Sequence, residues 1–179
     1  MKNIILLLTL FALFTSSAMA QPAGPPAATL SEMAKLKFLV GSWKGSGWME
    51  YAPGQKQPFN SSEQVELKLD GLLLLIEGIH HVSLPAEKRE LKIHHALATI
   101  TYDAARKDYA VRANKATGES VDARAQFTDG AFIWGFQDPR LGHLRFTIRL
   151  ADGKWQEIGE RSVDGRTWTK YLEMNLTKS

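Results

Sequence analysis

The chain has 179 residues, with 22 Lys and Arg against 19 Asp and Glu, and it contains no cysteine. The absence of cysteine excludes a disulfide framework, so packing has to stabilise the fold. Basic and acidic residues alternate along the chain and form no basic stripe, which argues against a nucleic-acid-binding protein.

The first twenty residues predict a signal peptide. Lys2 precedes an apolar run at residues 4–14, and the small residues at 17–20 form a cleavage motif. The apolar run is shorter than the roughly 20 residues that a membrane-spanning helix needs, and no later run replaces it. We therefore expect residues 1–20 to be removed on export to the periplasm or medium, with no stable membrane insertion.

The remainder of the chain predicts a leader followed by one domain. Residues 21–30 are rich in Pro, Ala and Gly, a composition typical of a flexible segment. Residues 31–179 are long enough for one domain with a sizeable core. Ser31 is the expected N-cap of a short helix whose apolar face, including Met33 and Leu36, would close one end of the domain.

Beyond Trp43 the apolar residues recur with a period of two, which predicts β-strands almost to the end of the chain. Asp-Gly pairs at residues 70–71, 129–130, 152–153 and 164–165 mark turns. About ten strands with short connections favour an all-β fold, an antiparallel up-and-down β-barrel with a short N-terminal helix. The expected strands are residues 42–51, 64–70, 72–82, 92–102, 108–114, 119–127, 131–136, 143–150, 154–161 and 166–176.

Alternation also predicts which side chains face the barrel interior. Exposure of Lys92 would turn Ile93, His95, Leu97 and Thr99 inward, although a bulge in this strand would reverse that assignment. The other expected inward residues are Val65, Leu67, Leu69, Leu74, Ile76, Gly78, His80, Val82, Val121, Ala123, Ala125, Phe127, Leu144, Phe146 and Ile148. This lining is aliphatic and small, so the interior is either a ligand cavity or a core filled by large neighbours such as Trp43 and Trp155.

Two histidine pairs, at residues 80–81 and 94–95, lie on strands that are expected to be neighbours. One member of each pair, His80 and His95, would meet inside the barrel. Two imidazoles without a carboxylate or thiolate make a poor zinc site, so a polar contact to a ligand is the favoured interpretation. Glu157 and Glu160 are expected to be exposed, and no catalytic constellation is recognisable.

Four segments together resemble a family of uncharacterised, often exported bacterial proteins with a lipocalin-like or nitrobindin-like barrel of calycin type. They are residues 39–45 (Leu-Val-Gly-Ser-Trp-Lys-Gly), 69–71 (Leu-Asp-Gly), 100–103 (Ile-Thr-Tyr-Asp) and 160–168 (Glu-Arg-Ser-Val-Asp-Gly-Arg-Thr-Trp). The nitrobindin branch holds haem through a histidine near its C-terminal strand. Residues 166–179 contain Tyr171 and Met174 but no histidine, so no haem of that kind, and no other cofactor, is expected.

Three functions are consistent with these observations. The first is an exported protein that binds a small apolar or amphipathic ligand inside the barrel without covalent chemistry. The second is a redox or enzymatic barrel that uses His80 and His95 with haem or a metal, and the third is a cell-envelope interaction scaffold with exposed aromatics at Trp48, Phe132 and Trp134. The expected ligand contacts are His80, His95, Tyr109, Ile76, Leu97 and Phe146.

Two further expectations concern assembly. Gly41, Trp43 and Trp168 are predicted to lie where the first and last strands meet and close the barrel. Apolar residues at 98–102 and 132–136 are expected on the outer surface, so both a monomer and a homodimer are possible.

Overall fold

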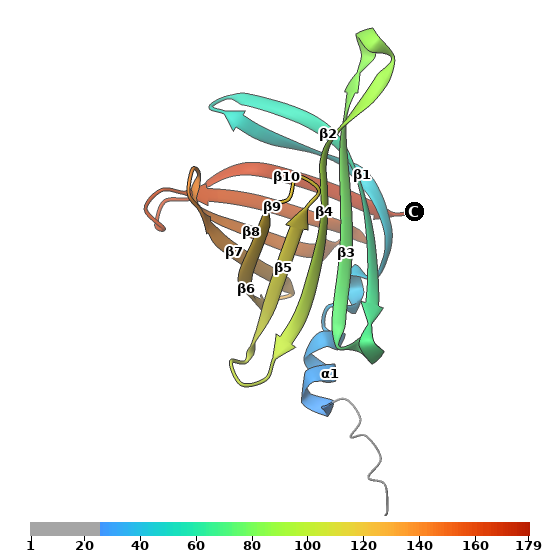
Figure 1. Cartoon of the computed structure of the whole chain (residues 1–179), viewed down its shortest axis with the longest axis vertical. Helices are drawn as coiled ribbons and strands as arrows, with labels where there is room; N and C mark the ends of the chain where they lie inside the picture. Colours follow the sequence, from blue (N-terminus) through green and yellow to red (C-terminus); the bar gives the residue numbers. More distant parts are fainter. Residues whose placement is uncertain (1–25) are drawn as a thin grey trace, which may run out of the picture.

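The computed structural model describes residues 26–179 and shows a closed antiparallel β-barrel of ten strands (Figure 1). Each strand pairs with its neighbours in sequence, and β1 pairs with β10 to close the barrel. The predicted fold class is therefore confirmed. The strands are β1 (Gly41–Ala52), β2 (Gln55–Lys68), β3 (Leu73–Leu84), β4 (Arg89–Asp103), β5 (Asp108–Lys115), β6 (Ser120–Thr128), β7 (Ala131–Asp138), β8 (Gly142–Ala151), β9 (Lys154–Ser162) and β10 (Thr169–Lys178).

A short helix, α1 (Ala27–Ala34), and a 3-10 turn, η1 (Lys37–Leu39), close the lower end of the barrel in Figure 1. Met33, Leu36 and Leu39 are fully buried there, as the apolar pattern predicts. The helix starts before the expected N-cap at Ser31, because the carbonyl of Pro26 accepts the first helical hydrogen bond, from the N–H of Leu30. The end of the predicted flexible leader is therefore helical.

Two side chains of the barrel wall form hydrogen bonds with the segment made of α1 and η1. The indole Nε1–H of Trp43, on β1, donates to the carbonyl oxygen of Leu39 over 2.7 Å. The hydroxyl of Tyr109, on β5, donates to the carbonyl oxygen of Glu32 over 3.0 Å. Both rings are almost completely buried, so these bonds form in the core and stabilise one position of the helix.

Strand β2 is longer than expected, because Pro58 does not end it. Pro58 pairs with Trp48 of β1, whereas pairing with β3 begins only at Asn60. A proline is tolerated in a strand where no second neighbour requires its N–H. Residues 55–63, expected as a loop, thus extend the barrel wall, and Leu69, expected inside, lies in an exposed turn with φ 51°.

A bulge between β3 and β4 reverses the expected orientation of β4. His80 pairs with His94, but His81 pairs with Lys92, so Ile93 is an extra residue. Lys92 is exposed as expected, yet beyond Ile93 the even-numbered residues face the interior. The assignment of Ile93, His95, Leu97 and Thr99 to the interior is therefore wrong.

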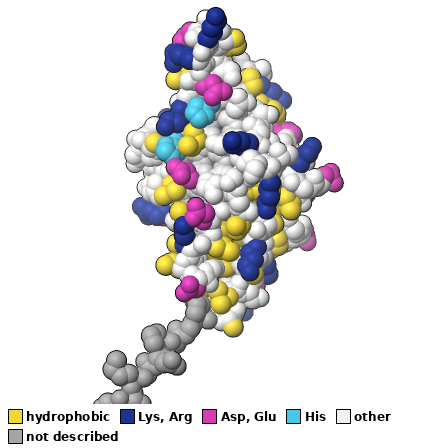
Figure 2. All heavy atoms as spheres, turned by 90° about the vertical axis from the view of Figure 1, so that its right-hand side faces the viewer, with side chains coloured by type: hydrophobic (Ala, Val, Ile, Leu, Met, Phe, Trp, Pro, Cys, Tyr) yellow, Lys and Arg dark blue, Asp and Glu magenta, His cyan; other side chains and the backbone are white. Residues whose placement is uncertain are grey.

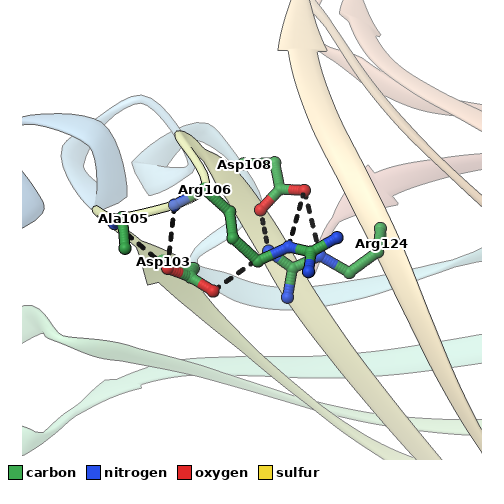
Figure 3. A network of polar contacts seen from close by, with 5 residues as sticks. All are labelled: Asp103, Ala105, Arg106, Asp108 and Arg124. Carbon is green, nitrogen blue, oxygen red and sulfur yellow. Dashed lines mark hydrogen bonds and ion pairs between the residues drawn. The ribbon is translucent and has the colours of Figure 1, made fainter.

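The outer surface carries interspersed acidic and basic side chains, as Figure 2 shows for one face. One partly buried feature of this surface is a network of polar contacts around Arg124 of β6 (Figure 3). Arg124 donates to Asp108 from Nε over 3.0 Å and to Asp103 from Nη2 over 3.3 Å. Asp108 Oδ1 is completely buried and lies against Arg124 Nη2, so this arginine neutralises two carboxylates at the β4–β5 turn.

Among residues 26–179, no helix has the length and apolar character needed to cross a membrane. The predicted signal peptide, residues 1–20, lies outside the described residues.

Candidate functional site

The candidate site is the half of the barrel interior that lies away from α1. Register places Phe59, Ser61 and Glu63 of β2 on the same face as Gly78 and His80 of β3. On the next strand His94, Ala96 and Ala98 continue this face, opposite His80, Gly78 and Ile76 respectively. The interior thus carries a polar cluster on β2, β3 and β4, made of Ser61, Glu63, His80 and His94.

Glu63 is the centre of this polar cluster. Only 6% of its side chain is exposed, and its Oε1 accepts a hydrogen bond from the Ser61 hydroxyl over 3.0 Å. The Nε2 atom of His80 lies 3.3 Å from the same oxygen. A Cβ atom at Gly78 would lie 2.4 Å from Glu63 Oε2, so only glycine at position 78 leaves space for this carboxyl group.

The two interior histidines are stacked with an aromatic ring. The imidazole of His80 lies parallel to the ring of Phe59, with centroids 4.6 Å apart. On its other side the ring of His94 lies 4.8 Å away, tilted by 33°. These contacts fix the ring plane of His80 and therefore direct its nitrogen toward Glu63.

A second carboxyl group, that of Glu157 on β9, faces the same space. Glu157 pairs with Ile148 of β8 and Met174 of β10, both of which point inward. Trp155 donates from Nε1 to Glu157 Oε2 over 3.3 Å. Protein surrounds the carboxyl group, yet Glu157 keeps some accessible surface, as expected for a side chain that borders an internal space.

Burial shifts the pKa values of all four groups toward their uncharged forms. It raises the pKa of Glu63 to about 8, and burial together with the nearby Glu63 raises the pKa of Glu157 to about 8. Burial, followed by the charge of His81, lowers the pKa of His80 to about 4, and burial likewise lowers the pKa of His94 to about 4. Near neutral pH Glu63 and Glu157 are therefore carboxylic acids, and His80 and His94 are neutral imidazoles.

Aromatic side chains cover the part of the interior formed by β7 and β8. Trp134 stacks on Phe146 with ring centroids 4.5 Å apart, and Phe136 lies 6.3 Å from Phe146. All three are only half-buried. Together, Trp134, Phe136 and Phe146 form a stack of aromatic rings inside the barrel, which we call the aromatic wall.

The two halves of the interior differ in packing. Near α1 the inward residues Leu74, Ile100, Phe132 and Ile148 are buried. In the other half, His94, Ala96, Ala98 and the aromatic wall keep accessible surface although they point inward. The space beside Gly47 is nevertheless occupied by a neighbouring side chain, since a Cβ atom at this position would lie 2.7 Å from the ring of Phe59. The interior is thus a filled core near the helix and more open beyond it.

The structure separates the expected ligand contacts into two groups. His80, Ile76 and Phe146 point into the barrel as predicted, and Tyr109 also points inward but uses its hydroxyl to bind Glu32. His95 lies outside, with Nε2 2.8 Å from Glu77 Oε1, and Leu97 is 40% exposed. The predicted interior pair of His80 and His95 is therefore wrong, and His94 takes the place of His95.

The closure and surface predictions have mixed outcomes. Gly41 and Trp43 lie on β1, and Trp43 pairs with Lys178 of β10 as predicted. Trp168 precedes β10 and instead lies against Arg145 of β8, with the guanidinium 4.1 Å from its ring centroid. The outward placement of residues 98–102 and 132–136 is wrong for their large apolar members, because Phe132 and Ile100 are buried and Trp134 faces inward.

Two residues of the candidate site, Glu63 and Glu157, were not predicted. Glu63 lies in the segment that was expected to be a loop, and Glu157 was expected to be exposed. Extending the alternation back from Val65 identifies Glu63 as inward. Counting forward from the buried Trp155 does the same for Glu157.

A hollow of about 1130 Å³ lies over the outer side of β4 to β7. Its outward side chains include Arg112 and Asp122, which bind each other over 2.9 Å, and Arg124 of the network described above. Its charged groups are thus used within the protein, whereas the interior cluster has acceptor atoms that remain free.

The residues present do not form the haem site that the nitrobindin resemblance implies. The inward side chains of β10 are Leu172, Met174 and Leu176, with no histidine among them. Among residues 26–179, no group of three or more His, Asp or Glu side chains is arranged to hold a metal ion.

The closed ten-stranded barrel, with a helix at one end and a more open interior at the other, defines an antiparallel up-and-down β-barrel protein. No family model and no curated protein matches the chain. Among solved structures it is similar to Rv2717c from M. tuberculosis, with a TM-score of 0.61 and 13% identity over 83% of this chain and 97% of that one. It is also similar to the S-type phycobiliprotein lyase CPES from Guillardia theta, with a TM-score of 0.58 and 12% identity over 86% of this chain and 98% of that one. Both are calycin-like barrels, and at these identities the likeness shows the fold alone.

Proposed function

We propose that the protein is an exported binding protein that holds a small apolar or amphipathic molecule in the open half of its barrel. One observation carries this proposal: inward-facing side chains of that half keep accessible surface, whereas those near α1 are buried. A ligand would cover this surface, and burial of its apolar part would supply most of the affinity.

The two kinds of lining suggest how the ligand is oriented. Its apolar part would pack on the aromatic wall, where Trp134 and Phe146 are already stacked. Its polar part would reach the cluster around Glu63 and His80. Few polar groups in a largely apolar pocket are the usual source of orientation and specificity in small-molecule sites.

The comparisons give general support. A barrel of this fold is compatible with a bound small molecule, and one similar structure is a phycobiliprotein lyase. Export rests on the apolar run and the cleavage motif of the first twenty residues.

Binding can be tested with a fluorescent apolar probe, 1-N-phenylnaphthylamine, added to the mature protein. We expect enhanced probe fluorescence and its loss in Ala98→Phe, which fills the open half from β4. Leu97→Phe is the matched control, because position 97 lies on the same strand but points outward. Equal probe binding by wild type and Ala98→Phe would contradict an interior site.

Export can be tested separately by expressing the full chain and measuring the intact mass of the protein in the periplasmic fraction. We expect cleavage after Ala20. Native mass spectrometry of the same fraction would reveal a co-purified ligand. A cytoplasmic protein of full-length mass would contradict the export part of the proposal.

A further inference from the structure

We propose that the ligand of the open half carries a protonated amine, and that Glu63 and Glu157 bind its ammonium group. This inference rests on the proposed function and names the chemical class of the ligand. It follows from the hydrogen-bonding capacity and the charge of the interior.

Glu63 has an acceptor atom without a protein donor. Its Oε1 is occupied by Ser61 and His80, but its Oε2 accepts no hydrogen bond from any residue between positions 26 and 179. The side chain is 94% buried, since 6% of it is exposed, and Oε2 occupies the space that a Cβ atom at position 78 would fill. This oxygen is not among the fully buried atoms that lack a partner, so it keeps access to the interior space and can accept a hydrogen bond from a ligand.

Among the described residues, no Lys or Arg forms an ion pair with Glu63 or Glu157. Arg161 and Lys115, whose charges act on Tyr171 and His94, pair with other groups: Arg161 donates to Glu50 over 3.2 Å and Lys115 donates to Glu119 over 3.1 Å. Neutral His80 and His94 carry no charge to balance an ionised Glu63. A positive charge would therefore have to arrive with the ligand.

The surroundings suit an ammonium group joined to an apolar body. Phe59 lies beside His80, and the half-buried aromatic wall lies across the interior on β7 and β8. Aromatic faces attract cations, and the same faces bury hydrocarbon. An anionic head group is disfavoured, since it would meet two carboxyl groups and no free cation.

Charge on Glu63 would then depend on the ligand. Without a ligand Glu63 is a carboxylic acid near neutral pH. With an ammonium group at Oε2 it becomes a carboxylate, so one O–H bond of the carboxyl group breaks and the proton leaves to solvent. The titratable groups beside Glu63 are His80, His94 and Glu157, and the further charges that act on these or on Tyr171 include those of His81, His95, Lys115 and Arg161.

The test compares octylamine, octanol and octanoate, three probes of equal chain length, by isothermal titration calorimetry with the mature protein. We expect octylamine to bind at least roughly tenfold tighter than octanol, and octanoate to bind weakest. Release of one proton would tighten octylamine binding by up to about tenfold per pH unit between about pH 6 and pH 8. Titrations in two buffers of different ionisation enthalpy measure that proton directly.

Glu63→Gln should abolish the preference for octylamine while octanol binding persists, and Glu77→Gln on the outer face of β3 should change neither. Equal affinity for octylamine and octanol, or no proton release by the wild type, would overturn the inference even if a variant fails to fold. If all three probes bind alike, the inference fails and the proposed function stands. If neither the probes nor 1-N-phenylnaphthylamine binds, both fail.

Discussion

Trp43 and Leu39 are joined by a hydrogen bond from the indole N–H to the carbonyl oxygen, 2.7 Å long and completely buried. The bond links η1 to β1, and β1 is one side of the seam at which the barrel closes. The ring of Trp155 meets that of Trp43 edge to face, with centroids 5.8 Å apart. One side chain thus holds the helical closure and the seam together.

Trp43→Phe should therefore destabilise the protein. Phenylalanine keeps an aromatic ring but leaves the carbonyl of Leu39 buried without its donor, which costs about 1–3 kcal/mol. Urea denaturation would measure the change in the free energy of unfolding. Trp48→Phe is the control, because Trp48 is only half-buried and its ring is covered by Lys56. An unchanged unfolding midpoint for Trp43→Phe would contradict this role.

Tyr109→Phe should loosen α1 without opening the barrel. The variant loses the hydrogen bond to Glu32, worth about 1 kcal/mol. Amide hydrogen exchange should become faster in α1 and remain slow in β5. Tyr102→Phe is the matched control, since its ring contacts Tyr109 at 5.2 Å while its hydroxyl binds no residue of the described chain. Equal effects of the two substitutions would contradict the role assigned to the Tyr109 hydroxyl.

Stability should fall as pH rises from about 6.5 to about 8. In this range unfolded glutamates, with a pKa of 4.5, have lost their protons, whereas folded Glu63 and Glu157 keep theirs up to about pH 8. The folded state then holds more protons than the unfolded state, so raising the pH favours unfolding. His80 and His94, neutral in the folded protein, are about half protonated in the unfolded chain at pH 6.5 and act in the opposite sense, but the two carboxyl groups outweigh them and the histidine contribution ends within about one pH unit.

The expected loss is at most about 1.4 kcal/mol per pH unit for each carboxyl group. Urea denaturation at the two pH values measures it. Glu63→Gln should remove part of this dependence, while Glu77→Gln should leave it unchanged. Stability that is constant or that rises between these pH values would show that the two interior carboxyl groups are ionised in the folded protein.

Arg124→Met should destabilise the barrel by about 1–3 kcal/mol, because it leaves the largely buried carboxylate of Asp108 with only the more distant Arg106, 3.9 Å away (Figure 3). Arg112→Met is the matched control on the neighbouring strand. The Arg112–Asp122 pair is mostly exposed, and such pairs contribute about 0–1 kcal/mol. Thermal unfolding would compare the two variants, and equal melting temperatures would contradict the assignment.

Most of the strand pattern was predictable, because each strand has one face toward the core and turn residues at its ends. The Asp-Gly turns are an example: at 129–130 both residues have positive φ, 50° and 70°, as a tight hairpin turn requires. The inward assignments of β6 and β8 also follow from strict alternation, and the structure confirms them. Local chemistry decides these features, so the sequence is sufficient.

The candidate site was harder to predict, because two of its acids break general rules. Pro58 indicates a loop unless the neighbouring strands are known. Glu63 lies in the segment that was assigned to this loop, so its inward orientation was not predicted. Glutamate is rarely buried, so Glu157 was assigned to solvent. His94 depended on the bulge at Ile93, which the sequence allows but does not locate. In each case the missing information is the pairing of distant strands.

The bulge at Ile93 determines how β4 would respond to the loss of one residue. Removing that one residue would place Lys92 next to His94 and restore strict alternation without exchanging the faces of β4, because Lys92 already pairs with His81 and His94 with His80. His94, Ala96 and Ala98 would therefore keep their places in the interior, and His95 and Leu97 would stay on the outer face. A chain shorter by one residue at this position would thus keep the chemistry of the pocket wall and change only the course of β4 at the bulge.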